Sequence, residues 1–143
     1  MKVLVDTPIW SLAFRKKEIS NANNNVISNL INLIQDGQIA IIGSIRQEVL
    51  SGISDKNKFY EIRNKMSAFP DYIIRTEDYE FAAECSNECR RNGIQGSHTD
   101  FLICAIAIKN DWKIFTEDAD FLNYEKYIPV KIYRFRPNDI QVK

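Results

Sequence analysis

The chain has 143 residues, of which 45% are hydrophobic and 27% are charged. These values are ordinary for a globular protein large enough to bury a core, so we expect a single domain over residues 1–143. Because 19 Lys and Arg residues balance 19 Asp and Glu residues, the bulk charge directs the chain toward neither nucleic acid nor a membrane. A nucleic-acid substrate stays compatible with this balance if the acids collect in one cleft and bases line its rim.

The sequence predicts no targeting or membrane-spanning segment. Lys2 is followed at once by a short apolar run, which is not a signal-peptide pattern. No apolar run approaches the roughly 20 residues that cross a bilayer. Three cysteines, an odd number, lie in helical patterns, which is typical of unpaired thiols in a reducing compartment. We therefore expect a cytoplasmic protein without a membrane partner.

Strand and helix patterns alternate from the start of the chain. Val3–Val5 predicts a strand, and the short helix after it can be capped by Thr7, with Pro8 in the first helical position. The polar run 21–25 is expected to be a loop. Apolar residues then recur at helical spacing over 26–34, which predicts a second helix.

Two helices are expected between the second and third strands, and we call this pair the helical arm. Ile39–Ile42 predicts the second strand. The segment 44–47 has the pattern of a capping box that opens the first helix of the arm. Asp55 can cap the second helix, which Pro70 stops. The run 72–74 predicts a short third strand.

The second half continues the alternation. A long helix is expected from Thr76 to about Arg91, and another begins near Ser97. The runs 113–115 and 130–134 predict two more strands. Strands that alternate with helices favour a three-layer α/β fold, in which helices flank a mostly parallel central sheet.

Four acidic residues fall at corresponding places of separate strand–helix units. Asp6 closes the first strand, Glu48 lies one short helical turn after the second, Asp100 opens an apolar helix, and Asp118 follows the strand 113–115. In an open parallel sheet the carboxyl ends of the strands converge on one crevice. Carboxylates gathered there repel one another unless a divalent cation neutralises them, and such oxygen ligands suit Mg²⁺ or Mn²⁺. The pattern predicts a metal-dependent site.

Each acid also has a purely structural interpretation. Asp6 could be a solvated turn residue, and Glu48 could lie on the exposed side of its helix. Asp100 could interact with the dipole of its helix, and Asp118 and Asp120 could cap the next one. These interpretations do not explain why all four acids fall at positions that the fold brings together, so we favour the joint site.

Four sequence segments then resemble a known family. They occur in the order and spacing of the four acidic blocks of the PIN-domain family, and are most similar to VapC toxins, the ribonucleases of bacterial type II toxin–antitoxin systems. The resemblance runs from Lys2 to about Arg134, and Thr7 fits the small hydroxyl or thiol residue that follows the first acid. The segments are Val3-Leu4-Val5-Asp6-Thr7, Arg46-Gln47-Glu48-Val49-Leu50, 96–105 with Asp100, and 116–121 with Asp118.

The resemblance implies a PIN-like domain that acts as a Mg²⁺- or Mn²⁺-dependent endoribonuclease. Its catalytic acids would be Asp6, Glu48, Asp100 and Asp118, with Asp6, Asp100 and Asp118 as metal ligands. Thr7 and Thr116 would support them through hydroxyl hydrogen bonds, and Asp120 would be either a further ligand or a support in the outer shell. The implied partners are an RNA substrate, a small cognate VapB-like antitoxin and a second copy in a homodimer. The alternative is a non-catalytic PIN-like module that binds RNA or protein.

Other features stay open at this stage. His98 is either a surface residue or a group that touches the substrate. Cys85 and Cys89 either pack in the core or, with His98, hold a soft metal. A phosphatase of the haloacid dehalogenase type is disfavoured because it needs a second Asp two residues after Asp6, where this chain has proline. Candidate bases for the rim of the cleft are 15–17, Arg46, 90–91 and Lys109.

Overall fold

Four short parallel strands form the centre of the fold. The structure is a computed structural model that describes residues 1–15 and 21–134. The strands are ordered β2-β1-β3-β4 in the sheet, and β1 pairs in parallel with both β2 and β3, while β3 pairs in parallel with β4. Their bounds are β1 Val3–Val5, β2 Ile39–Ala40, β3 Lys113–Phe115 and β4 Lys131–Ile132.

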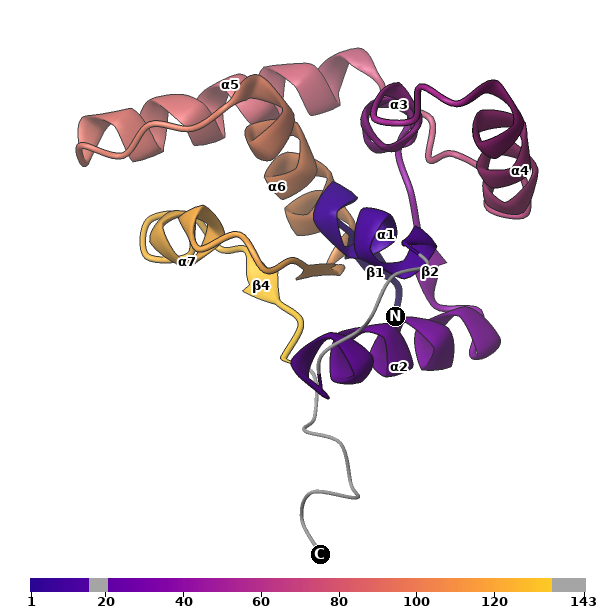
Figure 1. Cartoon of the computed structure of the whole chain (residues 1–143). Helices are drawn as coiled ribbons and strands as arrows, with labels where there is room; N and C mark the ends of the chain where they lie inside the picture. The colour runs from indigo at the N-terminus through magenta and orange to yellow at the C-terminus, as the bar shows by residue number, and fades with distance from the viewer. Residues whose placement is uncertain (16–20, 135–143) are drawn as a thin grey trace, which may run out of the picture.

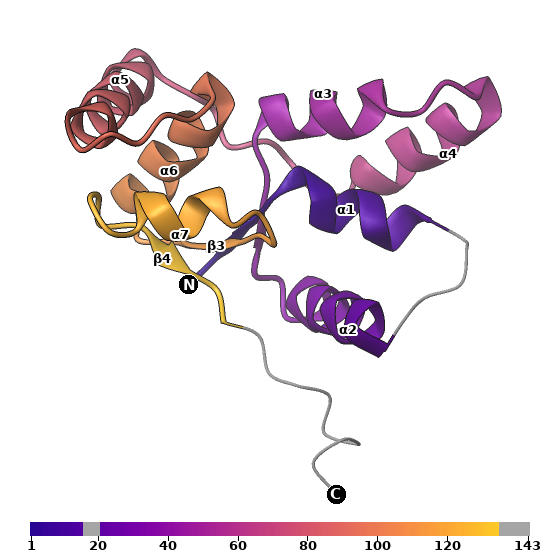
Figure 2. The ribbon, with the colours of Figure 1, turned by 60° about the vertical axis from the view of Figure 1, so that its left-hand side comes forward.

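Helices cover both faces of this sheet. Figures 1 and 2 show α2 on one side of the strands and α6 on the other, with α5 lying across the outer side of α6. The arm formed by α3 and α4 extends from the sheet beside α1. The predicted three-layer α/β class is therefore confirmed. The helices are α1 Thr7–Phe14, α2 Asn21–Gln35, α3 Gly43–Ser51, α4 Lys56–Met66, α5 Thr76–Arg91, α6 His98–Asn110 and α7 Asp120–Tyr124.

Helix α6 runs through the hydrophobic core. Every residue from Phe101 to Ala107 is buried, so this helix is apolar on all sides, as is expected of a helix enclosed by a sheet and by another helix. Among residues 1–15 and 21–134, no helix is both long and apolar enough to cross a membrane.

Several helix boundaries agree with the sequence predictions. Helix α5 spans Thr76–Arg91 as expected. The Asp55 side chain accepts a hydrogen bond from the Lys58 backbone at the start of α4, and Ser97 caps α6 by accepting one from the Asp100 backbone. At the starts of α4 and α6, the predicted capping residue accepts a hydrogen bond from a backbone N–H group that has no partner within the helix. These two predicted starts are therefore confirmed.

Two predicted caps are wrong. Asp6, not Thr7, caps α1, because its carboxylate accepts a hydrogen bond from the Thr7 backbone. Helix α3 begins at Gly43, with Ile42 as its N-cap and no side-chain capping bond, so the capping box over 44–47 does not form. The Ser44 hydroxyl is instead buried, without a hydrogen-bond partner among the described residues.

The predicted loop over 21–25 is also wrong, because α2 already begins at Asn21. Asparagine is a weak helix former, but the following residues Val26, Leu30 and Leu33 are buried at helical spacing. Packing of this face stabilises the helix more than the intrinsic preference of asparagine opposes it.

The predicted third strand over 72–74 reduces to one bridge. Tyr72 pairs in parallel with Ile42, and its backbone donates a hydrogen bond to Ile41. Ile73 is 75% exposed, so the segment leaves the sheet after a single pairing. The strand expected over 130–134 is shorter than predicted and spans Lys131–Ile132.

A buried carboxylate ties α5 to α6. Asp78 is fully buried and accepts hydrogen bonds from the Arg75 backbone, the Tyr72 hydroxyl and the Lys109 ammonium. Burial alone would raise the pKa of Asp78, but these hydrogen bonds and the charge of Lys109 together hold its pKa below the usual range. Lys109 was a candidate base for the rim of the cleft, but its ammonium group pairs with Asp78 and joins α6 to α5.

We expect Asp78→Ala to lower the free energy of unfolding by about 3 kcal/mol, because it breaks a buried ion pair and removes a helix cap. The matched control Glu77→Ala removes an exposed acid from the same turn and should cost less than about 0.5 kcal/mol. Because the folded-state pKa of Asp78 is depressed, its contribution is present above the unfolded pKa near 4 and is lost as the pH falls through the folded pKa. Chemical denaturation should therefore show the stabilities of the wild type and Asp78→Ala converging below about pH 4. Equal stability of these two proteins at pH 7 would contradict the role of Asp78.

Candidate functional site

The site begins where β1 ends. The Asp6 backbone N–H still donates to the Phe115 carbonyl of β3 at 2.9 Å, and its side chain is only 6% exposed. One carboxylate oxygen accepts from the Thr7 backbone at 2.9 Å, and the other accepts from the Thr116 hydroxyl at 2.8 Å. Asp6 is therefore a buried cap of α1 and not a solvated turn residue, and its carboxylate is also held from the end of β3.

The same Thr116 hydroxyl joins Asp6 to the loop after β3. It accepts a hydrogen bond from the Asp118 backbone at 3.0 Å while its own hydrogen goes to Asp6. Asp118 in turn accepts from the Asp120 backbone at 2.9 Å. This chain of bonds fixes the loop 116–120 against the end of β1, and Thr116 takes the supporting position that the sequence predicted.

Asp100 enters from the first turn of α6. Its backbone donates to the Ser97 hydroxyl, and one carboxylate oxygen accepts from the Tyr124 hydroxyl at 2.7 Å. Carboxylate oxygens of Asp100, Asp118 and Asp120 lie within 4.8 Å of one another. The fold thus places three acids close together, from the first turn of α6, the loop after β3 and the start of α7.

Burial and mutual repulsion disfavour the charged forms of the two inner acids. Burial raises the pKa of Asp6, the hydrogen bonds from Thr116 and Thr7 lower it, and the charges of Asp100 and Asp118 raise it again. Burial likewise raises the pKa of Asp100, against the hydrogen bonds involving Tyr124 and Ser97, and nearby Asp118 and Asp120 add to the rise. Both pKa values lie above the ordinary range for aspartate, so holding these acids ionised is costly without a counter-charge.

Tyr124 is a site residue that the sequence analysis missed. Its ring is fully buried, and both burial and the hydrogen bond to Asp100 raise the pKa of its hydroxyl, which therefore stays a donor. Gly96 leaves room for it, because a Cβ at that position would lie 2.7 Å from the ring carbon that bears the hydroxyl. A glycine four residues before the acid is a signal for close packing, but nothing in the sequence indicated which side chain packs there.

Glu48 makes no described contact with this cluster. It is exposed on α3, and within residues 1–15 and 21–134 we find no hydrogen bond or ion pair that joins it to the other acids. Thr7 contributes its backbone N–H, while its hydroxyl is buried without a partner among the described residues. Asp120, for which a ligand and a supporting role were both open, offers an oxygen to the cluster.

The two cysteines and the histidine whose roles were left open lie in different environments. Cys85 and Cys89 are buried, and burial, with smaller effects of Cys89 and Glu84, raises the pKa of Cys85 to about 11. Protonated, enclosed thiols favour the packing interpretation over a soft-metal site. His98 is exposed and lines a groove beside α5.

The candidate bases for the rim also have defined positions. Arg46 binds Asp71 and the backbone carbonyls of Met66 and Phe69, which fixes the arm. Arg90 is exposed beside the same groove as His98. Of the run 15–17, only the first residue belongs to the part of the chain that the structure describes.

The donor set fits a small divalent cation. The three clustered groups offer carboxylate oxygens, the ligands that Mg²⁺ and Mn²⁺ prefer. Oxygens on opposite sides of Mg²⁺ lie roughly 4 Å apart, so oxygens within 4.8 Å of one another need only small side-chain rotations to converge on one ion. A cation would also offset the burial and the smaller mutual repulsion that raise the pKa values of Asp6 and Asp100.

Comparisons with known proteins agree with this geometry. No family model matches the chain. It is 28% identical over 124 residues to Ribonuclease VapC11 of Mycobacterium tuberculosis, with 83% of this chain and 88% of the relative covered. VapC ribonuclease Mb1587 of Mycobacterium bovis gives the same values. The resemblance to VapC proteins predicted from the four acidic segments is thereby confirmed.

Solved structures share the fold. VapBC2 from Rickettsia felis, bound to a DNA fragment from its promoter, superposes with a TM-score of 0.75 at 17% identity, covering 95% of this chain and 100% of the other. FitAcB from Neisseria gonorrhoeae gives 0.74 at 17% identity, covering 92% and 96%. These likenesses establish the architecture and leave the chemistry to be argued from the site.

We expect Asp100→Asn to keep or raise the melting temperature of the metal-free protein at pH 7. The substitution removes one negative charge from a crowded, partly buried cluster, and the amide can still accept a hydrogen bond from Tyr124. The control Tyr124→Phe removes only that bond and should lower the melting temperature slightly. A clear loss of stability in Asp100→Asn, measured by thermal denaturation in chelator, would contradict the repulsion.

Proposed function

We propose that this chain is a VapC-like PIN domain over residues 1–143 that hydrolyses RNA as the toxin of a type II toxin–antitoxin pair. The observation that carries the proposal is the acidic cluster of Asp100, Asp118 and Asp120, beside which Thr116 holds Asp6 by a hydrogen bond. Its acids lie in the segments that resemble the VapC family, and the chain is similar in sequence to proteins named as ribonucleases of that group.

Asp100, Asp118 and Asp120 would hold a Mg²⁺ or Mn²⁺ ion, with Asp6 at its inner side. The bound ion supplies Lewis acidity toward a phosphate oxygen and makes hydroxide accessible from water near neutral pH. Both Asp6 oxygens already accept one hydrogen bond each, so each retains lone-pair capacity for a ligand or a water. We keep Glu48 as the fourth catalytic acid, acting from α3 on substrate or through water.

The protein groups around the acids orient them. Thr116 and Tyr124 fix one oxygen of Asp6 and one of Asp100, respectively. Because one oxygen of each carboxylate is held in this way, the orientation of the whole carboxylate is fixed before substrate binds. Less reorganisation is then needed when substrate binds. In this account Thr116 and Tyr124 are positioning residues.

The alternative is a module that binds RNA or protein without cutting it. A pure RNA-binding surface gains from bases that neutralise phosphates, whereas this site gathers acids whose charges already raise the pKa values of Asp6 and Asp100. Such an arrangement opposes RNA binding unless a cation is present. We therefore favour metal-dependent cleavage.

We expect the purified protein to cleave RNA in Mg²⁺ or Mn²⁺ and to lose this activity in excess chelator. Asp6→Asn and Asp100→Asn should each reduce cleavage by at least about a hundredfold, because each removes a negative charge that would hold the cation at the reacting phosphate. Asp111→Asn, at the far end of α6, is the matched control and should cleave like the wild type. Sequencing of RNA ends after induction of the wild type and of Asp6→Asn provides the readout in cells. Full cleavage by either variant in the acidic cluster would remove these residues from the catalytic site.

The partners follow from the same proposal. A cytoplasmic ribonuclease toxin requires a small cognate antitoxin of the VapB type, and we propose a homodimer as the form that binds it. A hollow of about 300 Å³ between α1 and the arm, lined in part by Phe14, Val49 and Ile53, supports an apolar anchor there. From this hollow the antitoxin would extend a basic side chain toward the acidic cluster.

Inhibition by the antitoxin should weaken when its basic residue nearest the cluster is neutralised, while the complex persists through apolar contacts. An arginine could pair bidentately with the carboxylates and exclude the metal. Co-purification measures the complex, and RNA cleavage by the purified complex measures inhibition. If the native host yields no small partner, and the protein encoded beside this gene neither binds nor inhibits, the toxin assignment fails while the ribonuclease assignment stands.

A further inference from the structure

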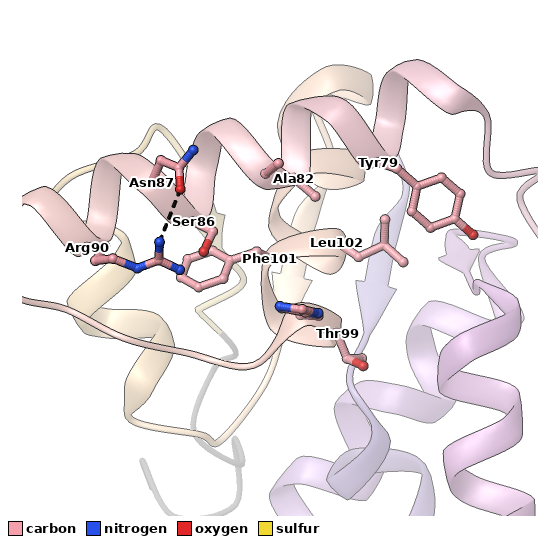
Figure 3. A pocket seen from close by; sticks show the side chains of 10 residues that line it. Tyr79, Ala82, Ser86, Asn87, Arg90, Thr99, Phe101 and Leu102 are labelled. Carbon is pink, nitrogen blue, oxygen red and sulfur yellow. Dashed lines mark hydrogen bonds between the residues drawn. The ribbon is translucent and has the colours of Figure 1, made fainter.

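A groove of about 400 Å³ runs between α5 and the first turn of α6. Figure 3 shows α5 as one wall, with Tyr79 near one end and Arg90 near the other, and Thr99 and Leu102 of α6 facing it. The eleven-residue separation of Tyr79 and Arg90 corresponds to roughly 16 Å along the helix. A hollow of this volume is in the range of sites that bind small ligands.

The groove combines an apolar floor with polar ends. Ala82, Phe101 and Leu102 are buried and form the floor, whereas Tyr79 keeps 57% of its surface exposed. Arg90 reaches its neighbour Asn87 only at 3.5 Å, which is a weak bond that a better acceptor can replace.

The charge of the groove contrasts with that of the neighbouring cluster. Its described lining includes the cation Arg90 and the imidazole His98 but no carboxylate, although the chain has 19 Asp and Glu residues. Such a lining is complementary to a ligand that has a flat apolar part and a negative charge.

The groove and the acidic cluster share the first turn of α6. His98 and Thr99 line it, and the next residue, Asp100, shares the cluster with Asp118. A chain-like ligand whose phosphate lies at the acids can therefore continue into the groove across the first turn of α6.

We propose that this groove binds a nucleotide of the single-stranded RNA substrate, next to the bond that is cut. Its base packs on the floor and near Tyr79, its polar edge faces Asn87 and His98, and Arg90 binds a phosphate. Proteins read single-stranded RNA in this manner, by stacking and by hydrogen bonds to base edges. The inference rests on the proposed ribonuclease function and adds the residues that select the sequence.

The test uses two substitutions in the full-length protein, each with a matched control. Arg90→Gln removes the cation of the groove, and Arg91→Gln removes the neighbouring cation, which instead pairs with Glu88 on another face. Ala83→Trp fills the groove from an exposed position, whereas Ala83→Ser leaves it open. All three positions are exposed, and melting temperatures verify that the four variants fold.

Two readouts separate this inference from the proposed function. The first is Mn²⁺-dependent cleavage of single-stranded RNA oligonucleotides with a randomised centre, followed by sequencing of the ends. The second is binding of a fluorescein-labelled pool of the same oligonucleotides in Mn²⁺, measured by anisotropy with each groove variant placed in the cleavage-deficient Asp6→Asn background. Arg90→Gln and Ala83→Trp should weaken binding about tenfold, raise KM more than they lower kcat, and alter base preference at one position beside the cut. Arg91→Gln and Ala83→Ser should match the wild type.

Three results would overturn the inference. If Arg90→Gln and Ala83→Trp both bind RNA as tightly as the wild type and keep its base preference, RNA does not occupy the groove. Equal losses in Arg90→Gln and Arg91→Gln would indicate general charge attraction. A dimer that becomes monomeric only in Ala83→Trp, measured by light scattering, would show that a second copy covers the groove. Groove-dependent binding without cleavage would support the site and refute the ribonuclease.

Discussion

The hydrogen bond from the Thr116 hydroxyl to Asp6 is the constraint on which the site depends. It joins the end of β1 to the end of β3, which are neighbours in the sheet but lie 110 residues apart in the chain. The same hydroxyl receives the Asp118 backbone. One side chain therefore sets the position of an inner acid and of the loop that carries the outer ones.

The fold gathers these acids against their repulsion. The closed core around α6 fixes Asp100 near the loop after β3, and Tyr124, which packs on Phe101 and Phe121, holds one of its oxygens. Burial, with a smaller contribution from this repulsion, raises the pKa values of Asp6 and Asp100. A stable core can tolerate the unfavourable electrostatic free energy of this group of charges. A divalent cation that relieves the repulsion would gain binding free energy from doing so.

The sequence predicted the parts of the fold and site that follow from periodicity and strand order. Alternating strands and helices identified the α/β class. The positions of Asp6 and Asp118 after apolar runs, and of Asp100 at the start of an apolar helix, indicated their convergence, because parallel strands end at one edge. It failed where a tertiary contact decides the outcome. Burial of one face extends α2 through 21–25, where asparagines suggested a loop.

Site details that depend on packing were also not predictable. The approach of Tyr124 to Asp100 needs the space that Gly96 leaves, and no local pattern joins residues 24 positions apart. Similarly, Lys109 had the appearance of a surface base until its partner, the buried Asp78, was placed beside it. Motif spacing identifies which residue types meet, but only the packed core determines which side chain holds which oxygen.

The most direct test of this account is the melting temperature as a function of Mn²⁺ concentration. An ion that binds only the assembled cluster stabilises the folded state by mass action, so the wild type should gain several degrees between chelator and millimolar Mn²⁺, by roughly 2–4 °C per kcal/mol of binding. Asp100→Asn and Asp118→Asn should lose most of this gain, while Asp111→Asn, outside the cluster, should keep it. A wild-type melting temperature unchanged by Mn²⁺, or an equal gain in all four proteins, would contradict a metal site at these acids.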